Sequence, residues 1–439
     1  MKKSLALLIV ALFGATNATA GDLLTVYREA LAYDASFAAA RASLDASREK
    51  LPQGRAGLLP TIGLSANTTH NDVDSTSRTT GVTAGAQYNS NGWTVSLSQP
   101  VFRWQNWTGY RKGALAVAQA EAQFGGARQD MTVRVAQAYF DVLLAQEAVA
   151  TAQAQKAAIA EQLESAKRNF EVGTATITDT HEAQARFDLA TAQELAAQND
   201  LTVRHQTLSS ITGKTPDTLK AFRAGAKIGL PQPDDMGKWA QTAETGNLTV
   251  QQTQVGLEIA GQEVETQKAG HYPTLDLVAT HGRSGTGYSS TGSGGSDSKS
   301  STIGLQLAIP IFSGGATVSK EREAVALREK ALADLDNARR AAAMSARQAY
   351  LGVTSGLAQI KAYEAAMASS QSALDSNKLG YEVGVRINID VLNAQSQLFD
   401  TRQKLAKARL DTLVAQMKLK AAAGTLSEDD VAAINALLE

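Results

Sequence analysis

The sequence of 439 residues predicts a mainly α-helical fold with four amphipathic β-strands, built from two copies of one architecture. Three observations predict this class: motifs that recur about 211 residues apart, long tracts without proline, and short regions in which apolar and polar residues alternate. The sequence contains no Cys, so disulfides and thiol chemistry are excluded. Its formal net charge of −1 gives no electrostatic support for binding nucleic acid.

Recurring motifs mark the two copies. Phe170–Asp179 reads FEVGTATITD and Tyr381–Asp390 reads YEVGVRINID, which places the same frame at an offset of 211 residues. Four further motif pairs follow in the same order: Pro60-Thr61 with Pro273-Thr274, Pro100-Val101-Phe102 with Pro310-Ile311-Phe312, Gln137-Ala138-Tyr139 with Gln348-Ala349-Tyr350, and Gly213 with Gly424. Because repeats of this kind indicate duplicated structural units, we expect a first repeat over residues 21–215 and a second over residues 216–439.

Proline shows where long helices are possible. No Pro lies between Pro100 and Pro216, and none follows Pro310. Since interior Pro breaks a helix, both tracts are free to be helical. A helix from about Gly113 to Phe170 would be about 87 Å long at ~1.5 Å per residue. Such a length is typical of a coiled-coil or tubular assembly.

Alternating residues predict strands at about 60–70, 92–103, 273–283 and 301–312. Each run is about 10–12 residues, the length of a tilted membrane-spanning strand. Aromatic residues near their ends resemble the girdle of a membrane barrel: Trp93, Phe102, Trp104, Trp107, Tyr110, Tyr272 and Phe312. Because lipid leaves no backbone group unpaired, four strands must be closed by other chains, and three chains would give twelve. Two hairpins packed on a soluble core are the alternative.

The N-terminus has the features of a secretory signal peptide. A basic start is followed by an apolar run from Leu5 to Phe13 and by Ala18-Thr19-Ala20, which is typical of a cleavage site. We therefore expect residues 1–20 to be removed and the mature chain to begin at Gly21. No Cys follows this site, so no lipid anchor is expected there.

These motifs resemble the TolC family of outer-membrane efflux and type I secretion channels. The resemblance is carried by the LLPT and HYPT strand starts, the QPVF and IPIF strand ends and the two EVG corners, and it covers residues 21–439. It implies a homotrimer in the outer membrane of a Gram-negative bacterium, with a twelve-stranded β-barrel and a long periplasmic α-helical barrel. The chain would be a passive export duct that docks a periplasmic adaptor and an inner-membrane pump.

The resemblance also implies a gate at the periplasmic tip. The EVG corners, with Gly173 and Gly384, would turn one helix into the next. Thr178 and Asp179 fall on the acceptor positions of the resting-state clamp, and Tyr381 and Arg386 fall on its donor positions. A hydroxyl and a guanidinium on one carboxylate form a charge-assisted network that can hold helices together. The alternative is that Asp179 only caps its own helix.

The resemblance further implies a pore ring just after the second EVG corner. Asp390 corresponds to the acidic ring of the family, where carboxylates around a narrow axis attract cations. Asn393 departs from the pattern because a second Asp is expected there, which weakens the expected cation selectivity.

The sequence lacks enzyme signals. His181-Glu182 is followed by Ala185 rather than by a second His, Gly213-Lys214-Thr215 has Leu208 where a P-loop needs Gly, and no G-x-S-x-G occurs. We therefore expect no enzyme activity, no cofactor and no metal. A periplasmic coiled-coil adaptor or structural protein is the alternative function. The sequence leaves open the cargo, the identity of adaptor and pump, and whether the entrance is closed at rest.

Overall fold

A computed structural model describes residues 21–214, 218–223, 225–287 and 294–439, which form two compact units. Unit 1 takes its described residues from 21–39, 127–243 and 343–439, and unit 2 consists of residues 40–126 and 244–342. Each unit therefore combines segments from both halves of the sequence. The predicted signal peptide, residues 1–20, lies outside the described residues.

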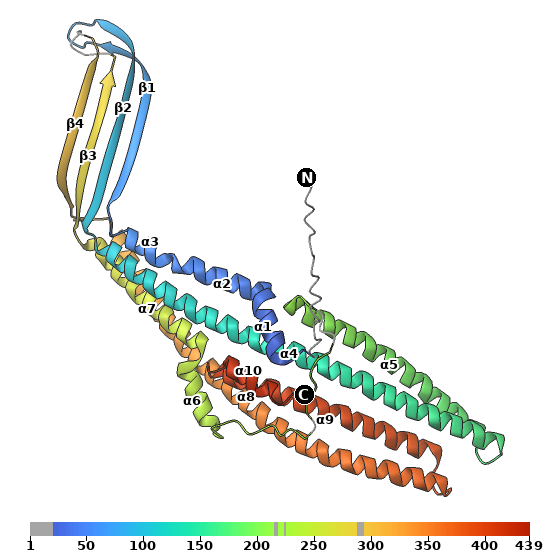
Figure 1. Ribbon diagram of the computed structural model, residues 1–439. Helices are drawn as coiled ribbons and strands as arrows, with labels where there is room; N and C mark the ends of the chain where they lie inside the picture. Colours follow the sequence, from blue (N-terminus) through green and yellow to red (C-terminus); the bar gives the residue numbers. More distant parts are fainter. Residues whose placement is uncertain (1–20, 215–217, 224, 288–293) are drawn as a thin grey trace, which may run out of the picture. The chain divides into compact units, whose positions relative to one another are not determined.

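Unit 2 carries one four-stranded antiparallel sheet in the order β1-β2-β3-β4 (Figure 1). Its strands are β1 (Thr61–Thr76), β2 (Thr83–Phe102), β3 (Thr274–Thr286) and β4 (Ser296–Ala308). All four predicted strands are present. Each neighbouring pair is in continuous antiparallel register except for a shift between Pro100 and Phe102.

The strands are longer than the predicted 10–12 residues, since they contain 13 to 20. The sequence pattern marked only the part with alternating apolar residues, whereas backbone pairing continues through polar residues to the pair Thr76–Thr83. At its other end β4 stops at Ala308, so Ile309 and Ile311 lie outside the strand. Pro310 between them has no N–H to donate to a ladder, which accounts for the earlier end.

The two faces of the sheet differ in polarity. Residues directly opposite in an antiparallel pair share a face, and one row across the sheet consists of Ile62, Leu97, Ala279 and Ile303. The adjacent row, on the other face, consists of Gly63, Ser96, Thr280 and Thr302. Within one chain the apolar row is open, with Ile62 71% and Ile303 77% exposed. The sheet therefore presents an uncovered apolar face.

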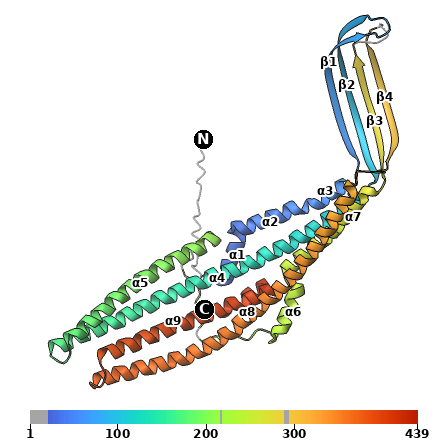
Figure 2. The same cartoon turned by 180° about the vertical axis from the view of Figure 1, so that it is seen from behind.

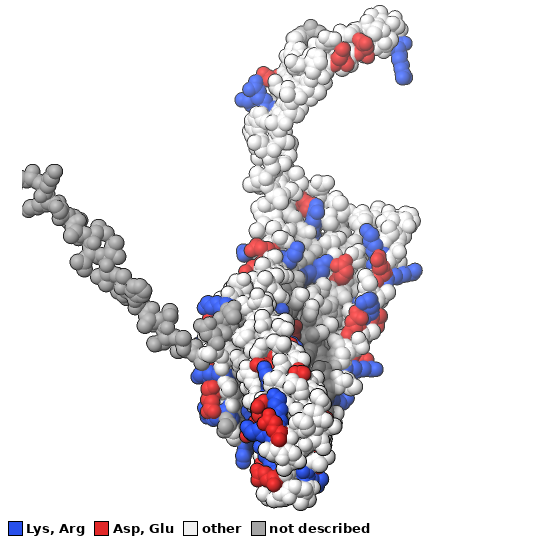
Figure 3. Space-filling model, turned by 90° about the vertical axis from the view of Figure 1, so that its right-hand side faces the viewer, with Lys and Arg blue, Asp and Glu red and all other residues white. Residues whose placement is uncertain are grey.

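The apolar part of this face covers only some of the length of the sheet. On β3 it consists of Leu275, Leu277 and Ala279, about 14 Å at ~3.4 Å per residue, and His281 and Arg283 follow on the same face. Trp93 pairs with Arg283 in the polar row beyond it. Figure 3 shows charged side chains toward the loop end and the foot of the sheet, with an uncharged stretch between them.

Four long helices dominate the rest of the chain: α4 (Trp104–Glu171), α5 (Ile177–Thr212), α8 (Ala316–Glu382) and α9 (Asn388–Ala422). The predicted helix start near Gly113 is wrong by nine residues, because α4 begins at Trp104 directly after β2. Trp104, Trp107 and Tyr110 therefore lie in its first turns. In unit 1, α5 runs back along α4 and α9 runs back along α8 (Figures 1 and 2).

The shorter helices are α1 (Leu23–Tyr33), α2 (Ala35–Arg48), α3 (Lys50–Ala56), α6 (Met236–Gly246), α7 (Leu248–Lys268), the 3-10 turn η1 (Ala269–His271) and α10 (Glu428–Asn435). Among the helices of the described ranges, none combines the length and the hydropathy needed to cross a lipid bilayer.

Tyr139 and Tyr350, which lie 211 residues apart in the sequence, each donate a hydrogen bond to the segment between α5 and α6. Tyr139 is fully buried and donates to the Lys220 carbonyl at 2.8 Å, and burial raises the pKa of its hydroxyl. Tyr350 donates to the Asp234 carboxylate at 2.6 Å. Beside Tyr350, Trp239 packs in a buried cluster with Val353 and Leu419. The duplicated tyrosines thus hold the connecting segment against the helices of unit 1.

Candidate functional site

The candidate site lies where the long helices of unit 1 turn back, at residues 172–176 and 383–387. Both corners close with the same backbone hydrogen bonds: the Thr174 N–H donates to the Asn169 carbonyl, and the Val385 N–H donates to the Gly380 carbonyl, each at 2.8 Å. Gly173 and Gly384 have φ of 78° and 75°, a left-handed conformation that glycine adopts at least cost after a helix end. The two corners are therefore one structure made twice.

Asp179 is the third residue of α5 and takes part in its N-terminal cap. The Asp179 carboxylate accepts from the Thr176 N–H at 3.0 Å and from the Thr176 hydroxyl at 2.9 Å, and the Asp179 N–H donates to the Thr176 hydroxyl. This reciprocal pattern is a capping box. At the second corner Ile387 takes the place of Thr176 and has no side chain that can cap. Asp390, the counterpart of Asp179, is therefore free of this role.

Tyr381 links the two corners. Its hydroxyl accepts a hydrogen bond from the Asn169 amide at 3.0 Å, so the end of α8 is tied to the end of α4. Within the described part of one chain, Asp179 bonds to Thr176 and to neither Tyr381 nor Arg386. The sequence did not identify Asn169 as a partner, since nothing in its spacing distinguishes it from other polar residues of α4.

Arg386 and Asp390 form a loose ion pair within the second corner. Arg386 Nη1 lies 3.7 Å from Asp390 Oδ2, and the two side chains are 58% and 34% exposed. Exposed pairs of this kind contribute about 0–1 kcal/mol. Arg386 is thus available to other carboxylates, and Thr178 is exposed beside Asp179.

A second contact joins α5 to α9 just beyond the corners. Arg186 donates from Nη2 to the Asn393 Oδ1 at 3.0 Å. Arg186 also borders a small cavity of about 60 Å³ with Ile159 and Leu392. Sequence reasoning missed Arg186, because no motif or periodicity marks an arginine whose partner lies 207 residues away.

The interface of α9 near the corner contains buried amides. Asn388 and Gln395 are each 3% exposed, and neither Asn388 amide atom nor the Gln395 carbonyl oxygen has a hydrogen-bond partner within the described residues. Leu392 packs beside them on Ile159 and Ala190. Because an unpaired buried polar group costs roughly 1–3 kcal/mol, separating these helices in water recovers part of that cost.

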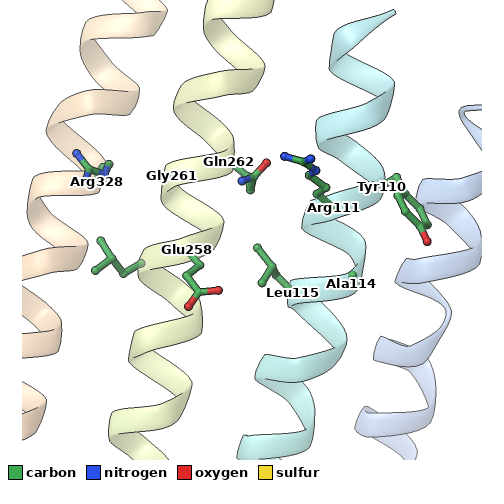
Figure 4. Close-up of a pocket in the computed structure, with 9 residues that line it drawn as sticks. Tyr110, Arg111, Ala114, Leu115, Glu258, Gly261, Gln262 and Arg328 are labelled. Atoms are coloured by element: carbon green, nitrogen blue, oxygen red, sulfur yellow. The ribbon is translucent and has the colours of Figure 1, made fainter.

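A groove lies elsewhere, in unit 2. Figure 4 shows this groove of about 560 Å³, with Arg111 and Leu115 from α4, Glu258 and Gln262 from α7, and Arg328 from α8. These side chains do not pair a nucleophile with a base, and the described ranges hold no group of three or more His, Cys, Asp or Glu side chains able to bind a metal. None of the predicted site residues lines this groove.

Comparison of the whole chain with known proteins identifies its family. The family model described as Outer membrane efflux protein matches residues 26–214 and 239–425. Alkaline protease secretion protein AprF of Pseudomonas aeruginosa is 34% identical over 94% of this chain and 87% of its own length. Outer membrane protein TolC of Escherichia coli is 32% identical over 99% of this chain and 89% of its own length.

Solved structures show the same fold. CusC gives a TM-score of 0.79 at 17% identity and covers 92% of both chains. VceC, an outer membrane protein from Vibrio cholerae, gives a TM-score of 0.77 at 20% identity and covers 92% of this chain and 96% of its own.

Proposed function

The chain belongs to the outer membrane efflux protein family, and from this premise we propose that it works as a passive, homotrimeric export duct gated at its two helix corners. It is an outer-membrane channel of the type used in efflux and type I secretion systems of Gram-negative bacteria, with a periplasmic helical portion. Such systems supply adaptor and inner-membrane partners.

The open edges of the sheet support the trimer. β1 and β4 each have one paired neighbour in the chain, so their outer edges expose unpaired backbone groups. In lipid every such group must be paired, and a closed barrel achieves this. Three chains of four strands give twelve, enough for an aqueous lumen. The uncovered apolar row with Ile62 and Ile303 supplies the lipid-facing surface.

The duplicated corners support the gate. Two corners per chain and three chains place six corners around one entrance. Tyr381 ties the corners of one chain together through Asn169, and we assign the exposed Arg386 to a bond with the Thr178–Asp179 corner of a neighbouring chain. Asp390 and Asn393 lie on the following helix, where we place the pore ring. A charge-assisted bond repeated by symmetry would hold the entrance closed at rest.

We propose a non-enzymatic role without cofactor, because the chain belongs to a family of channel proteins. Transport through a duct needs no bond-making group, and energy would come from the inner-membrane partner. The cargo of the duct is left open between small molecules and polypeptides, because a passive duct has no chemical group that selects between them.

The oligomeric state tests this proposal. The full chain is expressed in a Gram-negative host, the outer-membrane fraction is separated on a density gradient, and the mass of the protein in mild detergent is measured by light scattering. We expect the outer-membrane fraction and a protein mass three times that of the mature protomer. A monomer in the outer membrane, or a protein in the inner-membrane or soluble periplasmic fraction, would contradict it.

A further inference from the structure

We propose that Arg186 sets the ion selectivity of the entrance by offsetting the charge of the Asp390 ring. This inference rests on the proposed function, since it assigns a role to a residue beside the proposed pore. It concerns selectivity rather than opening, and Arg386 enters it only as the ion-pair partner of Asp390.

The contact that carries the inference joins two helices. Arg186 Nη2, on α5, lies 3.0 Å from Asn393 Oδ1 on α9, and Asn393 follows Asp390 by one helical turn. The guanidinium is therefore held at the level of the ring by a fixed partner. Glu182, one turn nearer the corner, makes no ion pair with Arg186 among the described residues.

The partner of Arg186 leaves its charge uncancelled. A guanidinium stays protonated at any relevant pH, and a neutral amide accepts a hydrogen bond without neutralising the donor. Arg386, at 3.7 Å, already offsets Asp390. At this level each chain also carries Asp179, the counterpart of Asp390, and Glu182, the counterpart of Asn393, so the carboxylates outnumber the two guanidiniums. Removing Arg186 therefore leaves one further uncompensated negative charge in each chain, three in a trimer, and shifts the entrance toward cations.

The same contact explains what an acidic residue at 393 would do. In Asn393→Asp the new carboxylate would lie within hydrogen-bonding distance of Arg186 and form an ion pair with it. Its field in the pore would then be largely cancelled. The effect of Asn393→Asp on selectivity is therefore expected to be smaller with Arg186 present than with Arg186 removed, a coupling that a double-mutant cycle measures.

The experiment records the reversal potential of the purified full-length channel in planar bilayers under a KCl gradient. We expect Arg186→Gln to move the reversal potential toward the K⁺ equilibrium potential and Arg186→Lys to keep the wild-type value, because Lys retains the charge. Arg204→Gln, on the same helix but paired with Asp141 and Asp200, is the matched control and should also keep it. If Arg186 acted only by packing and hydrogen bonding, Arg186→Lys would change the reversal potential as well.

The outcomes separate this inference from the proposed function. If the wild type conducts and Arg186→Gln keeps the wild-type reversal potential, the inference is wrong while the channel proposal stands. If no variant and no wild-type protein conducts, the proposed function itself fails. Arg186→Met, which keeps an unbranched stem, replaces Arg186→Gln if the latter does not reach the membrane. Equal shifts by Asn393→Asp in the two backgrounds would also overturn the inference.

Discussion

The double variant Tyr381→Phe with Arg386→Ser is expected to raise the single-channel conductance several-fold. Phe keeps the ring of Tyr381 but loses the hydroxyl that accepts from Asn169 at 3.0 Å. Ser removes the guanidinium that we place against the neighbouring chain. A neutral hydrogen bond contributes roughly 0.5–1.5 kcal/mol and a charge-assisted one roughly 1.5–3 kcal/mol. Because these bonds would form in all three chains of the closed entrance, the double variant destabilises the closed state more than the open one.

The measurement compares conductance in planar bilayers and uptake of large antibiotics by intact cells. Tyr363→Phe with Arg402→Ser is the matched control. Tyr363 lies on α8, as Tyr381 does, and Arg402 bridges two helices through Glu147 at 2.9 Å, away from the corners. The control should conduct like the wild type. Wild-type conductance in the Tyr381 and Arg386 variant, with trimers properly inserted, would mean that other contacts hold the entrance.

Ile303→Arg is expected to abolish the outer-membrane trimer. Ile303 lies in the row that is apolar across all four strands and is 77% exposed in one chain. An Arg on the lipid face near the middle of the bilayer costs about 2–4 kcal/mol, and each trimer would carry three. The measurement is the amount of trimer in the outer membrane, detected by its resistance to dissociation in mild detergent.

Thr302→Arg provides the sharpest control, because residue 302 is the sequence neighbour of 303 and lies on the polar face opposite Thr280. We expect Thr302→Arg to assemble, since an arginine facing water-filled space is hydrated. Equal assembly of the two variants would favour hairpins that rest on a soluble core, the alternative that the sequence alone leaves open.

The sequence predicted the architecture because its signals are local and duplicated. Alternation over a few residues indicates a strand wherever it occurs, and the missing prolines delimit the long helices. Gly173 and Gly384 recur in one frame because both must adopt positive φ. The periplasmic adaptor alternative is excluded by the family match, which spans most of both repeats.

The strand ends and the contacts at the corners could not be predicted from the sequence, because they depend on pairing between distant segments. The ends of β1 and β2 are set by backbone pairing that polar residues support without any hydrophobic pattern. The link from Tyr381 to Asn169 and the link from Arg186 to Asn393 each join residues more than 200 positions apart. Capping of α5 by Thr176 and Asp179 has a local signature, T-x-x-D, which sequence reasoning passed over in favour of Asp179 alone.

Single-channel recording of the purified wild-type protein tests whether three chains form an export duct. We expect discrete, stable conductance steps when detergent-solubilised trimers are added to a planar bilayer, and larger steps for the Tyr381→Phe with Arg386→Ser variant. Inserted, trimeric protein that gives no conductance steps in either form would show that the trimer is not an export duct.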